Sequence, residues 1–251
     1  MQFTNIAAAP NIQSMSKTIP CVLMRAGTSR GPFFLSDWLP QDPQERDHVL
    51  IDAMGAADLL QLDGLGGGNS LTSKVAIVSR STRPDCELDY LFAQVGVGQR
   101  SVDTRPNCGN MLSGVLPFAI DQGLIAITAD TTRARIHNVN TGSRIEASVR
   151  TPGGRLSYDG LTRIDGVAGT AAPVHLNFLD AWGAVTGQVF PTGQRIDAVL
   201  GTPVTLIDAA MPLMVVHAHA LGLSGRETPA DLDTNTALLT RLEAMRLAAG
   251  R

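Results

Sequence analysis

The sequence predicts an α+β protein that is rich in strands and poor in helices. Short, β-prone apolar segments recur along the chain, whereas only three segments, at 42–54, 108–120 and 234–249, carry helix signals. Strands and helices do not alternate regularly, which argues against a doubly wound parallel sheet. The 251 residues suffice for two ordinary domains, and glycine and proline gather near 180–200, where we place the boundary.

The first predicted elements are two short strands, at 19–26 and 32–35, joined by a turn. This turn reads RAGTSRG at 25–31, and its hydroxyl side chains would suit contact with an anion, although an ordinary glycine turn has the same pattern. The helix at 42–54 follows, with Asp42 as its cap and Pro43 at its first position. Further strands are predicted at 75–78 and 88–97.

The second predicted helix, at 108–120, is limited or bent by Pro117 and closed by Gly123. Two or three strands are then expected between 125 and 149, from the segments LIAIT, RARIHNV and RIEASVR. More strands follow at 173–179, 204–207 and 213–218. The last element, at 234–249, is an amphipathic helix with a natural stop at Gly250.

Composition and charge argue against several classes of protein. The chain is 44% hydrophobic and 17% charged, as expected for a globular protein with a core, and its net charge of −3 comes without a basic stripe for nucleic acid. No apolar run reaches the roughly 18 residues of a membrane span. Three cysteines without zinc spacing fit neither a disulfide framework nor a zinc site and indicate the cytoplasm. Residues 1–14 lack signal-peptide features and are expected to be a disordered leader.

The glycine-rich run DGLGGGNSLTSK at 63–74 is not a phosphate-binding loop. A P-loop requires glycine directly before the lysine and Ser or Thr directly after it, whereas Ser73 precedes Lys74 and Val75 follows it. The run also leads into a strand rather than a helix. A lysine at the end of such a turn is a candidate base if its site is partly dry, and otherwise an ordinary surface lysine.

The segment NCGN at 107–110 opens the second predicted helix. The positive end of a helix dipole favours the thiolate form of Cys108, and the N–H groups of the first turn can hold a carboxylate. A buried structural cysteine is the alternative, and it is the reading we adopt for Cys21 and Cys86. His217 and His219 would share one face of a strand, but no third ligand is evident, so no metal is expected.

Eight motifs in a fixed order resemble the family of 2-methylaconitate cis–trans isomerase, methylitaconate isomerase and 4-oxalomesaconate tautomerase. The resemblance runs from about Ile19 to the last residue, and the motifs are MRAGTSRG at 24–31, DGLGG at 63–67, LTSKVAI at 71–77, DYLFAQ at 89–94, NCGN at 107–110, RIDG at 163–166, PTG at 191–193 and MP at 211–212. It implies the fold of diaminopimelate epimerase, in which two similar domains each wrap a sheet around a central helix. Residues 15–185 would form the first domain, and 186–251 the start of a second, incomplete one, because family members continue well beyond this point.

The resemblance also implies an isomerase that needs no cofactor and moves a proton by a 1,3-allylic shift. Lys74 and Cys108 would be the acid and the base, in an order left open, at a cleft between the domains. Segment 107–119 is most similar to the 4-oxalomesaconate enzymes of gallate, protocatechuate and lignin degradation. The implied substrate contacts are Thr28, Ser29, Ser70, Thr72, Ser73, Asn107, Gly109, Asn110, Met111 and Met211.

Several alternatives stay open. The substrate would be a small unsaturated tricarboxylic or keto acid, and 2-methylaconitate or methylitaconate could take the place of 4-oxalomesaconate. An inactive, truncated remnant that only binds carboxylates is a second hypothesis, and a Schiff-base enzyme that uses Lys74 is a third. We expect a cytoplasmic protein that forms a homodimer and binds neither nucleic acid nor membrane.

Overall fold

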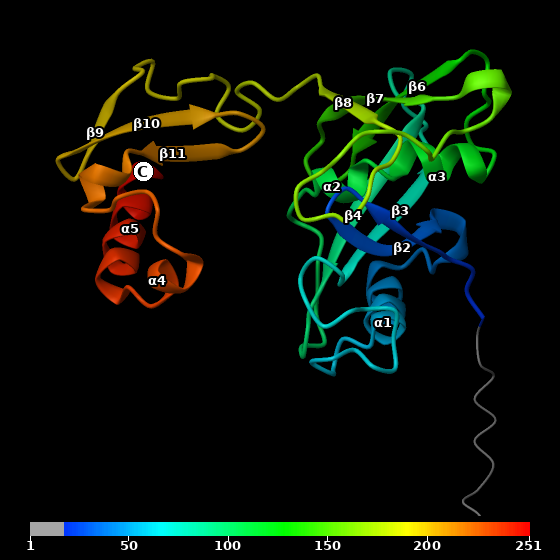
Figure 1. The fold of residues 1–251 in the computed structure, drawn as a ribbon, viewed down its shortest axis with the longest axis horizontal. Coiled ribbons are helices and arrows are strands. Elements are labelled where there is room, and N and C mark those ends of the chain that lie inside the picture. The colour runs from blue at the N-terminus through cyan, green and yellow to red at the C-terminus, as the bar shows by residue number, and fades with distance from the viewer. Residues whose placement is uncertain (1–17) are drawn as a thin grey trace, which may run out of the picture.

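A large mixed sheet dominates the first part of the chain in this computed structural model, which describes residues 18–251 (Figure 1). The predicted leader at 1–14 lies outside the described residues. Neighbouring strands are antiparallel except for two parallel pairs, β2 with β3 and β4 with β6. In spatial order the strands are β1 Val22–Ala26, β2 Ser29–Leu35, β3 Lys74–Arg80, β4 Leu88–Val95, β6 Thr131–Asn138, β7 Arg144–Arg150 and β8 Val174–Phe178, with β5 Val102–Asp103 beside β4.

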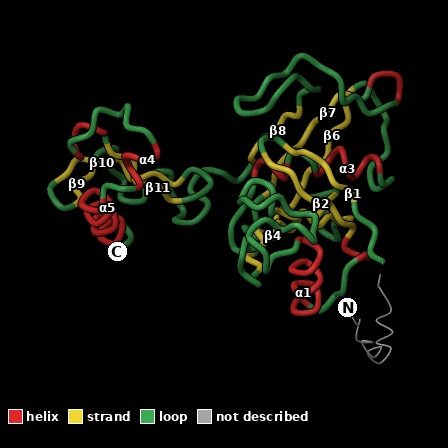
Figure 2. Tube along the Cα trace, turned by 60° about the horizontal axis from the view of Figure 1, so that its bottom comes forward, coloured by secondary structure: helices red, strands yellow, loops and turns green. Residues whose placement is uncertain are grey.

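The sheet wraps around a central helical segment made of α2, Gly109–Leu112, and α3, Val115–Asp121 (Figure 2). Their side chains share one core cluster with residues from strands far apart in the sheet, such as Phe33 of β2 and Ile145 of β7. This core is built largely from fully buried side chains. The expected α+β architecture, with a sheet folded around a central helix, is confirmed.

The central segment is two short helices rather than the single helix that the sequence predicts, and the break lies at Ser113 and Gly114, not at Pro117. Pro117 falls in the first turn of α3, where a missing N–H breaks no bond within the helix. Gly114 lies against Phe33, and a Cβ at this position would come within 2.5 Å of the phenyl ring. The close approach of Phe33 therefore requires a glycine at this position, between the two helices.

The outer face of the sheet is covered by α1, Pro43–Met54. Asp42 caps this helix as predicted, because its carboxylate accepts hydrogen bonds from the N–H groups of Gln44 and Glu45 at 3.0 and 2.9 Å. Gly55 closes the helix in a left-handed conformation. The predicted bounds of this helix and its cap at Asp42 are confirmed, whereas the role of Gly55 was not predicted.

A separate three-stranded sheet follows in the chain (Figure 1). It packs on the last helix around a small core of Val199, Val204 and Met245. Its elements are β9 Asp197–Val199, β10 Thr202–Asp208, β11 Pro212–Val216, α4 Pro229–Asp233 and α5 Thr236–Ala249, of which β9 and α4 were not predicted. The boundary expected between 185 and 186 falls in the segment that joins the two sheets, and it stays a prediction.

Two further predictions need correction. The segment LIAIT at 124–128 forms no strand, because the N–H groups of Leu124 and Ile125 bond to the carbonyl of Ala119 and close the end of α3. The turn predicted at 25–31 is tighter than expected, since the strands reach Ala26 and resume at Ser29. Short 3-10 turns occur at Ser36–Trp38, Pro152–Gly154 and Ala218–Leu221.

Candidate active site

Lys74 begins β3 on the face of the sheet that covers the central helix. Successive side chains of a strand point to opposite faces, so Lys74 points to the same side as Ala76, whose side chain lies in the central core. Its Nζ donates a hydrogen bond of 2.7 Å to Oε1 of Gln94 and lies 5.1 Å from the ring centroid of Phe92. Gln94 is anchored in turn, because its Nε2 donates to the carbonyl of Ser73 at 2.8 Å. The half-buried ammonium is therefore held in one place.

The backbone around Lys74 requires a glycine on the neighbouring strand. Gly31 of β2 lies so close to β3 that a Cβ at this position would collide with the carbonyl oxygen of Lys74. The same Cβ would also come within 3.3 Å of the methyl end of Met111 in α2. Gly31 thus lets β2, β3 and the start of the central helix approach one another at the position of the lysine.

Cys108 is the residue that precedes α2, and its side chain belongs to the same core cluster as Phe92. It is 9% exposed. The hydroxyl of the buried Tyr90 donates to its carbonyl oxygen at 3.2 Å. Burial, together with the adjacent Cys108 thiol, raises the pKa of Tyr90 well above its usual range, so the phenol stays a neutral donor. Because α2 has only four residues, its dipole is shorter than that of the single helix expected from the sequence.

The turn between β1 and β2 rests on the start of α2. The N–H of Thr28 donates to Oδ1 of Asn110 at 3.2 Å, and a Cβ at Gly27 would collide with the same amide oxygen. The hydroxyl of Ser29 is buried, and within residues 18–251 no hydrogen-bond partner reaches it. Leaving a buried hydroxyl without a partner costs free energy, so the Ser29 hydroxyl is available to donate a hydrogen bond to a bound acceptor. The structure thus brings the predicted residues Thr28, Ser29 and Asn110 together.

The predicted substrate contacts in the loop before Lys74 bond mainly to the protein itself. Ser73 is fully buried, and its hydroxyl accepts a 2.8 Å hydrogen bond from Gln61 on the opposite side of the sheet from the Lys74 side chain. Ser70 is exposed, and its carbonyl oxygen is the atom that contacts Gln94. The Thr72 hydroxyl donates to the carbonyl of Asn69 at 3.4 Å. Their expected contacts with a substrate stay predictions.

The two methionines of the predicted site differ in position. Met111 is fully buried in the central core, so its expected contact with a substrate stays a prediction. Met211 lies in the turn before β11 of the separate sheet and is 59% exposed. The structure therefore does not group Met211 with the cluster around Lys74 and Cys108.

Cavities flank the start of α2 on two sides. One, of about 380 Å³, is lined by Arg25, Gly109 and Asn110 together with loop residues between 156 and 174. The other, of about 260 Å³, is lined by Asn107, Asn140, Arg144 and residues of the connecting segment. Either has room for a small organic acid beside Gly109 or Asn107.

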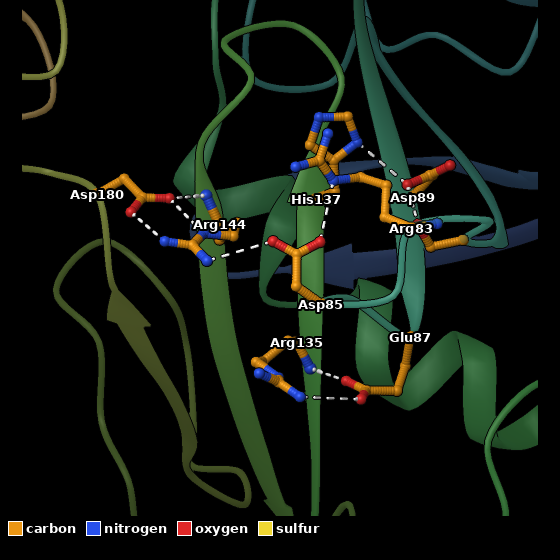
Figure 3. Close-up of polar contacts among 9 residues, drawn as sticks. Arg83, Asp85, Glu87, Asp89, Arg135, His137, Arg144 and Asp180 are labelled. Atoms are coloured by element: carbon orange, nitrogen blue, oxygen red, sulfur yellow. Dashed lines mark hydrogen bonds and ion pairs between the residues drawn. The ribbon is translucent and has the colours of Figure 1, made fainter.

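An ion-pair network borders the second cavity (Figure 3). Arg144 donates to both carboxylate oxygens of Asp180, at 2.9 and 2.8 Å, and to Asp85 at 3.2 Å. Hydrogen bonding to Arg144 lowers the pKa of Asp180 to about 2. The network fastens the end of β8 and the connecting segment to the sheet.

Several residues at this site were missed from the sequence. Tyr90 and Gln94 lie in the quoted motif DYLFAQ at 89–94, and strand periodicity could have placed both on the side of Lys74. Asn138 and Asn140, which contact the segment before Cys108, gave no such signal because they lie at the end of β6 and in the turn after it, remote in sequence.

Neither a cluster of metal-ligand side chains nor a membrane-spanning helix occurs in the part of the chain that the structure describes. No group of three or more His, Cys, Asp or Glu side chains that could hold a metal occurs within residues 18–251. The rings of His217 and His219 stack at 5.1 Å between centroids, with His219 in a 3-10 turn rather than on a strand. None of the described helices has both the length and the apolar character that crossing a bilayer requires.

A mixed sheet that wraps a short central helix, with a lysine on the sheet and a cysteine at the helix start, defines a protein of the diaminopimelate-epimerase-like fold class. The chain belongs to the PrpF protein family, whose model matches residues 16–251. The putative isomerase YbhH of Escherichia coli K12 is 58% identical over 235 residues, which cover 94% of this chain and 67% of that protein. The 4-oxalomesaconate tautomerase of Pseudomonas putida is 50% identical, with 92% of this chain and 64% of that protein covered.

A solved structure agrees with this placement. The crystal structure of methylitaconate-delta-isomerase matches with a TM-score of 0.79 and 44% identity, over 91% of this chain and 60% of that one. This similarity extends over both sheets, since it covers nine-tenths of the residues. The chain spans about 60 to 67% of the length of these relatives.

Proposed function

We propose that the chain is an isomerase that catalyses a 1,3-allylic proton shift on 4-oxalomesaconate, with Lys74 and Cys108 as the proton-transfer pair. The observation that carries this proposal is the arrangement of these two residues around one core. Lys74 lies over Phe92, held by Gln94, and Cys108 packs in the same cluster at the start of α2. Two relatives, 50% and 44% identical, are named 4-oxalomesaconate tautomerase and methylitaconate-delta-isomerase.

The reaction needs a base, an acid and donors for developing negative charge. One of the pair removes a proton from the carbon next to the double bond, which gives a dienolate conjugated with a carbonyl or carboxylate group. The other member returns a proton two carbons away, so the double bond moves while the molecular formula is unchanged. Because no electrons are gained or lost, no oxidant or reductant is required, and we propose that the chain uses no cofactor.

The donors that we propose for the anionic groups lie in the turn between β1 and β2 and on either side of Cys108 in the sequence. The buried Ser29 hydroxyl, which lacks a partner within the described residues, is one of them. We take the exposed Asn107 amide and the N–H groups of Gly109 to Met111 as the others. Asn107 lines one of the two cavities, and Gly109 and Asn110 line the other. A substrate with several carboxylates would use more than one of these donors.

Two observations favour 4-oxalomesaconate as the substrate: the motif at 107–119 and the similarity to the tautomerase. This substrate would place the protein in the cytoplasmic degradation of gallate, protocatechuate or lignin-derived compounds. Methylitaconate is the second candidate, favoured by the structural match with its isomerase. Ultraviolet spectra recorded with 4-oxalomesaconate, methylitaconate and 2-methylaconitate in turn decide between them. The highest kcat/KM is expected for 4-oxalomesaconate.

Two variants test the roles of the pair. Lys74→Ala and Cys108→Ser should each abolish turnover while the protein stays folded. Cys21→Ser, at an exposed cysteine outside the proposed site, is the matched control and should keep full activity. Full activity of Lys74→Ala would end the proposal. Binding of the acid without turnover would identify a carboxylate-binding remnant instead, and an adduct trapped by borohydride would identify a Schiff-base enzyme.

A further inference from the structure

The end of β6 and the turn after it make hydrogen bonds to the segment that precedes Cys108. The side-chain amide of Asn140 pairs with the backbone of Phe92, as a neighbouring strand would. Its Oδ1 accepts from the N–H of Phe92 and its Nδ2 donates to the Phe92 carbonyl, both at 2.8 Å. The same Nδ2 donates to the carbonyl of Thr104 at 2.5 Å. From the start of this turn, Asn138 donates to Oδ1 of Asn107 at 2.6 Å. Asn138 is fully buried, so this hydrogen bond starts from a residue inside the folded core.

The direction of the last hydrogen bond is fixed by a backbone group. Oδ1 of Asn138 accepts from the backbone N–H of Asn140 at 2.9 Å, and a backbone N–H can only donate. The other end of the Asn138 amide, which faces Asn107, must therefore be the NH₂ group. Because an NH₂ group can only donate, Asn107 must turn its oxygen toward Asn138 and its own NH₂ group away.

The NH₂ group of Asn107 is left free by this arrangement. It donates no hydrogen bond to any residue between 18 and 251. Asn107 is exposed and lines the cavity of about 260 Å³ beside the start of α2, one residue before Cys108. An oriented amide NH₂ at this position suits a carboxylate or enolate oxygen, which only accepts.

We propose that Asn138 is a positioning residue that sets the polarity of Asn107, so that Asn107 presents a donor rather than an acceptor to the substrate. This inference rests on the proposed function, because it assumes that an anionic acid binds beside Cys108. Asn138 does not touch the substrate and acts only through the orientation of the Asn107 amide.

The isosteric variant Asn138→Asp tests this proposal because it reverses the polarity. One carboxylate oxygen of the aspartate still accepts from the Asn140 N–H, and the other can only accept from Asn107. Asn107 must then rotate its NH₂ group inward and turn its oxygen toward the substrate. Asn138→Ala leaves Asn107 without a preferred orientation, so it should be the milder change although it removes more atoms.

The measurement is the Kd of propane-1,2,3-tricarboxylate, an acid with no double bond to move, by calorimetry. We expect a rise of a few fold for Asn138→Ala and of roughly tenfold to a hundredfold for Asn138→Asp. Asn177→Asp, which adds the same charge at an exposed position of β8, should change the Kd less than twofold. Melting temperatures identify any variant that has lost its fold.

The Asn107→Ala background separates rotation of the amide from simple charge repulsion. Without the Asn107 amide, Asn138→Asp and Asn138→Ala should give the same Kd within twofold. An Asp variant that stays as damaging in this background, or that binds as well as the Ala variant in the parent protein, overturns the inference alone. A parent protein that binds no tricarboxylate removes the proposed function, and the inference with it.

Discussion

Gln94→Leu should disable catalysis without unfolding the protein. The substitution keeps the size of the side chain but removes the oxygen that accepts the 2.7 Å hydrogen bond from Lys74. It also removes the amide donor that binds the carbonyl of Ser73 at 2.8 Å. The ammonium would then be free to sample other positions over the ring of Phe92 and would spend less time where the proton is transferred.

The size of the effect follows from the bond that is lost. A hydrogen bond to a charged group contributes about 1.5–3 kcal/mol, and each 1.36 kcal/mol corresponds to about a tenfold change in rate. If this bond serves only to hold Lys74 in the reactive position, kcat should fall between about 10-fold and 100-fold. Loss of the second hydrogen bond should lower the free energy of unfolding by about 1 kcal/mol.

The assay is the change in ultraviolet absorbance of 4-oxalomesaconate, which gives kcat and KM, with urea unfolding measured on the same samples. Gln99→Leu is the matched control, since Gln99 is exposed in the turn after β4 and its side chain makes no hydrogen bond within residues 18–251. A folded Gln94→Leu variant with the kcat of the parent protein would refute the role given to Gln94.

Three substitutions probe the frame of the site. Gly31→Ala forces a methyl group into the backbone of the adjacent strand, and urea unfolding should show a loss of roughly 2–4 kcal/mol; an unchanged midpoint would contradict the close approach. Tyr90→Phe leaves the carbonyl of Cys108 without its donor and should cost about 1 kcal/mol by the same method. Asp180→Asn should lower stability by less than about 1 kcal/mol, since the pair with Arg144 is partly exposed. The pKa of Asp180 is lowered from 3.8 to about 2, so its contribution to the free energy of unfolding is present above pH 3.8. This contribution should disappear as the pH falls from 3.8 toward 2. At the lower pH the parent protein and Asp180→Asn should therefore unfold alike.

Features encoded by neighbouring residues were predictable from the sequence. The helix α1 carries its own start and stop signals, because Asp42 accepts from the first N–H groups and Gly55 adopts the left-handed conformation that ends it. The start of α2 could also be placed from the local NCGN segment, although no side chain caps this helix. The family motifs added the expected fold around these local elements.

Features that depend on remote contacts were not predictable. The need for a glycine at position 114, between α2 and α3, arises from the ring of Phe33 on a strand that is distant in sequence. The orientation of the Asn107 amide depends on its hydrogen bond with Asn138. Asn138 pairs with Tyr90, 48 residues earlier in the sequence, through the parallel pairing of β4 with β6. No local pattern reports such a contact, since it exists only once the strands are paired.

Proton NMR of 4-oxalomesaconate in D₂O tests the central claim most directly. If Lys74 and Cys108 move a proton between two carbons, the chain should convert the acid into its allylic isomer and place deuterium from the solvent at the newly protonated carbon. Lys74→Ala should show neither change over the same period. Failure of the parent protein to form the isomer, or equal conversion by Lys74→Ala, would contradict the account.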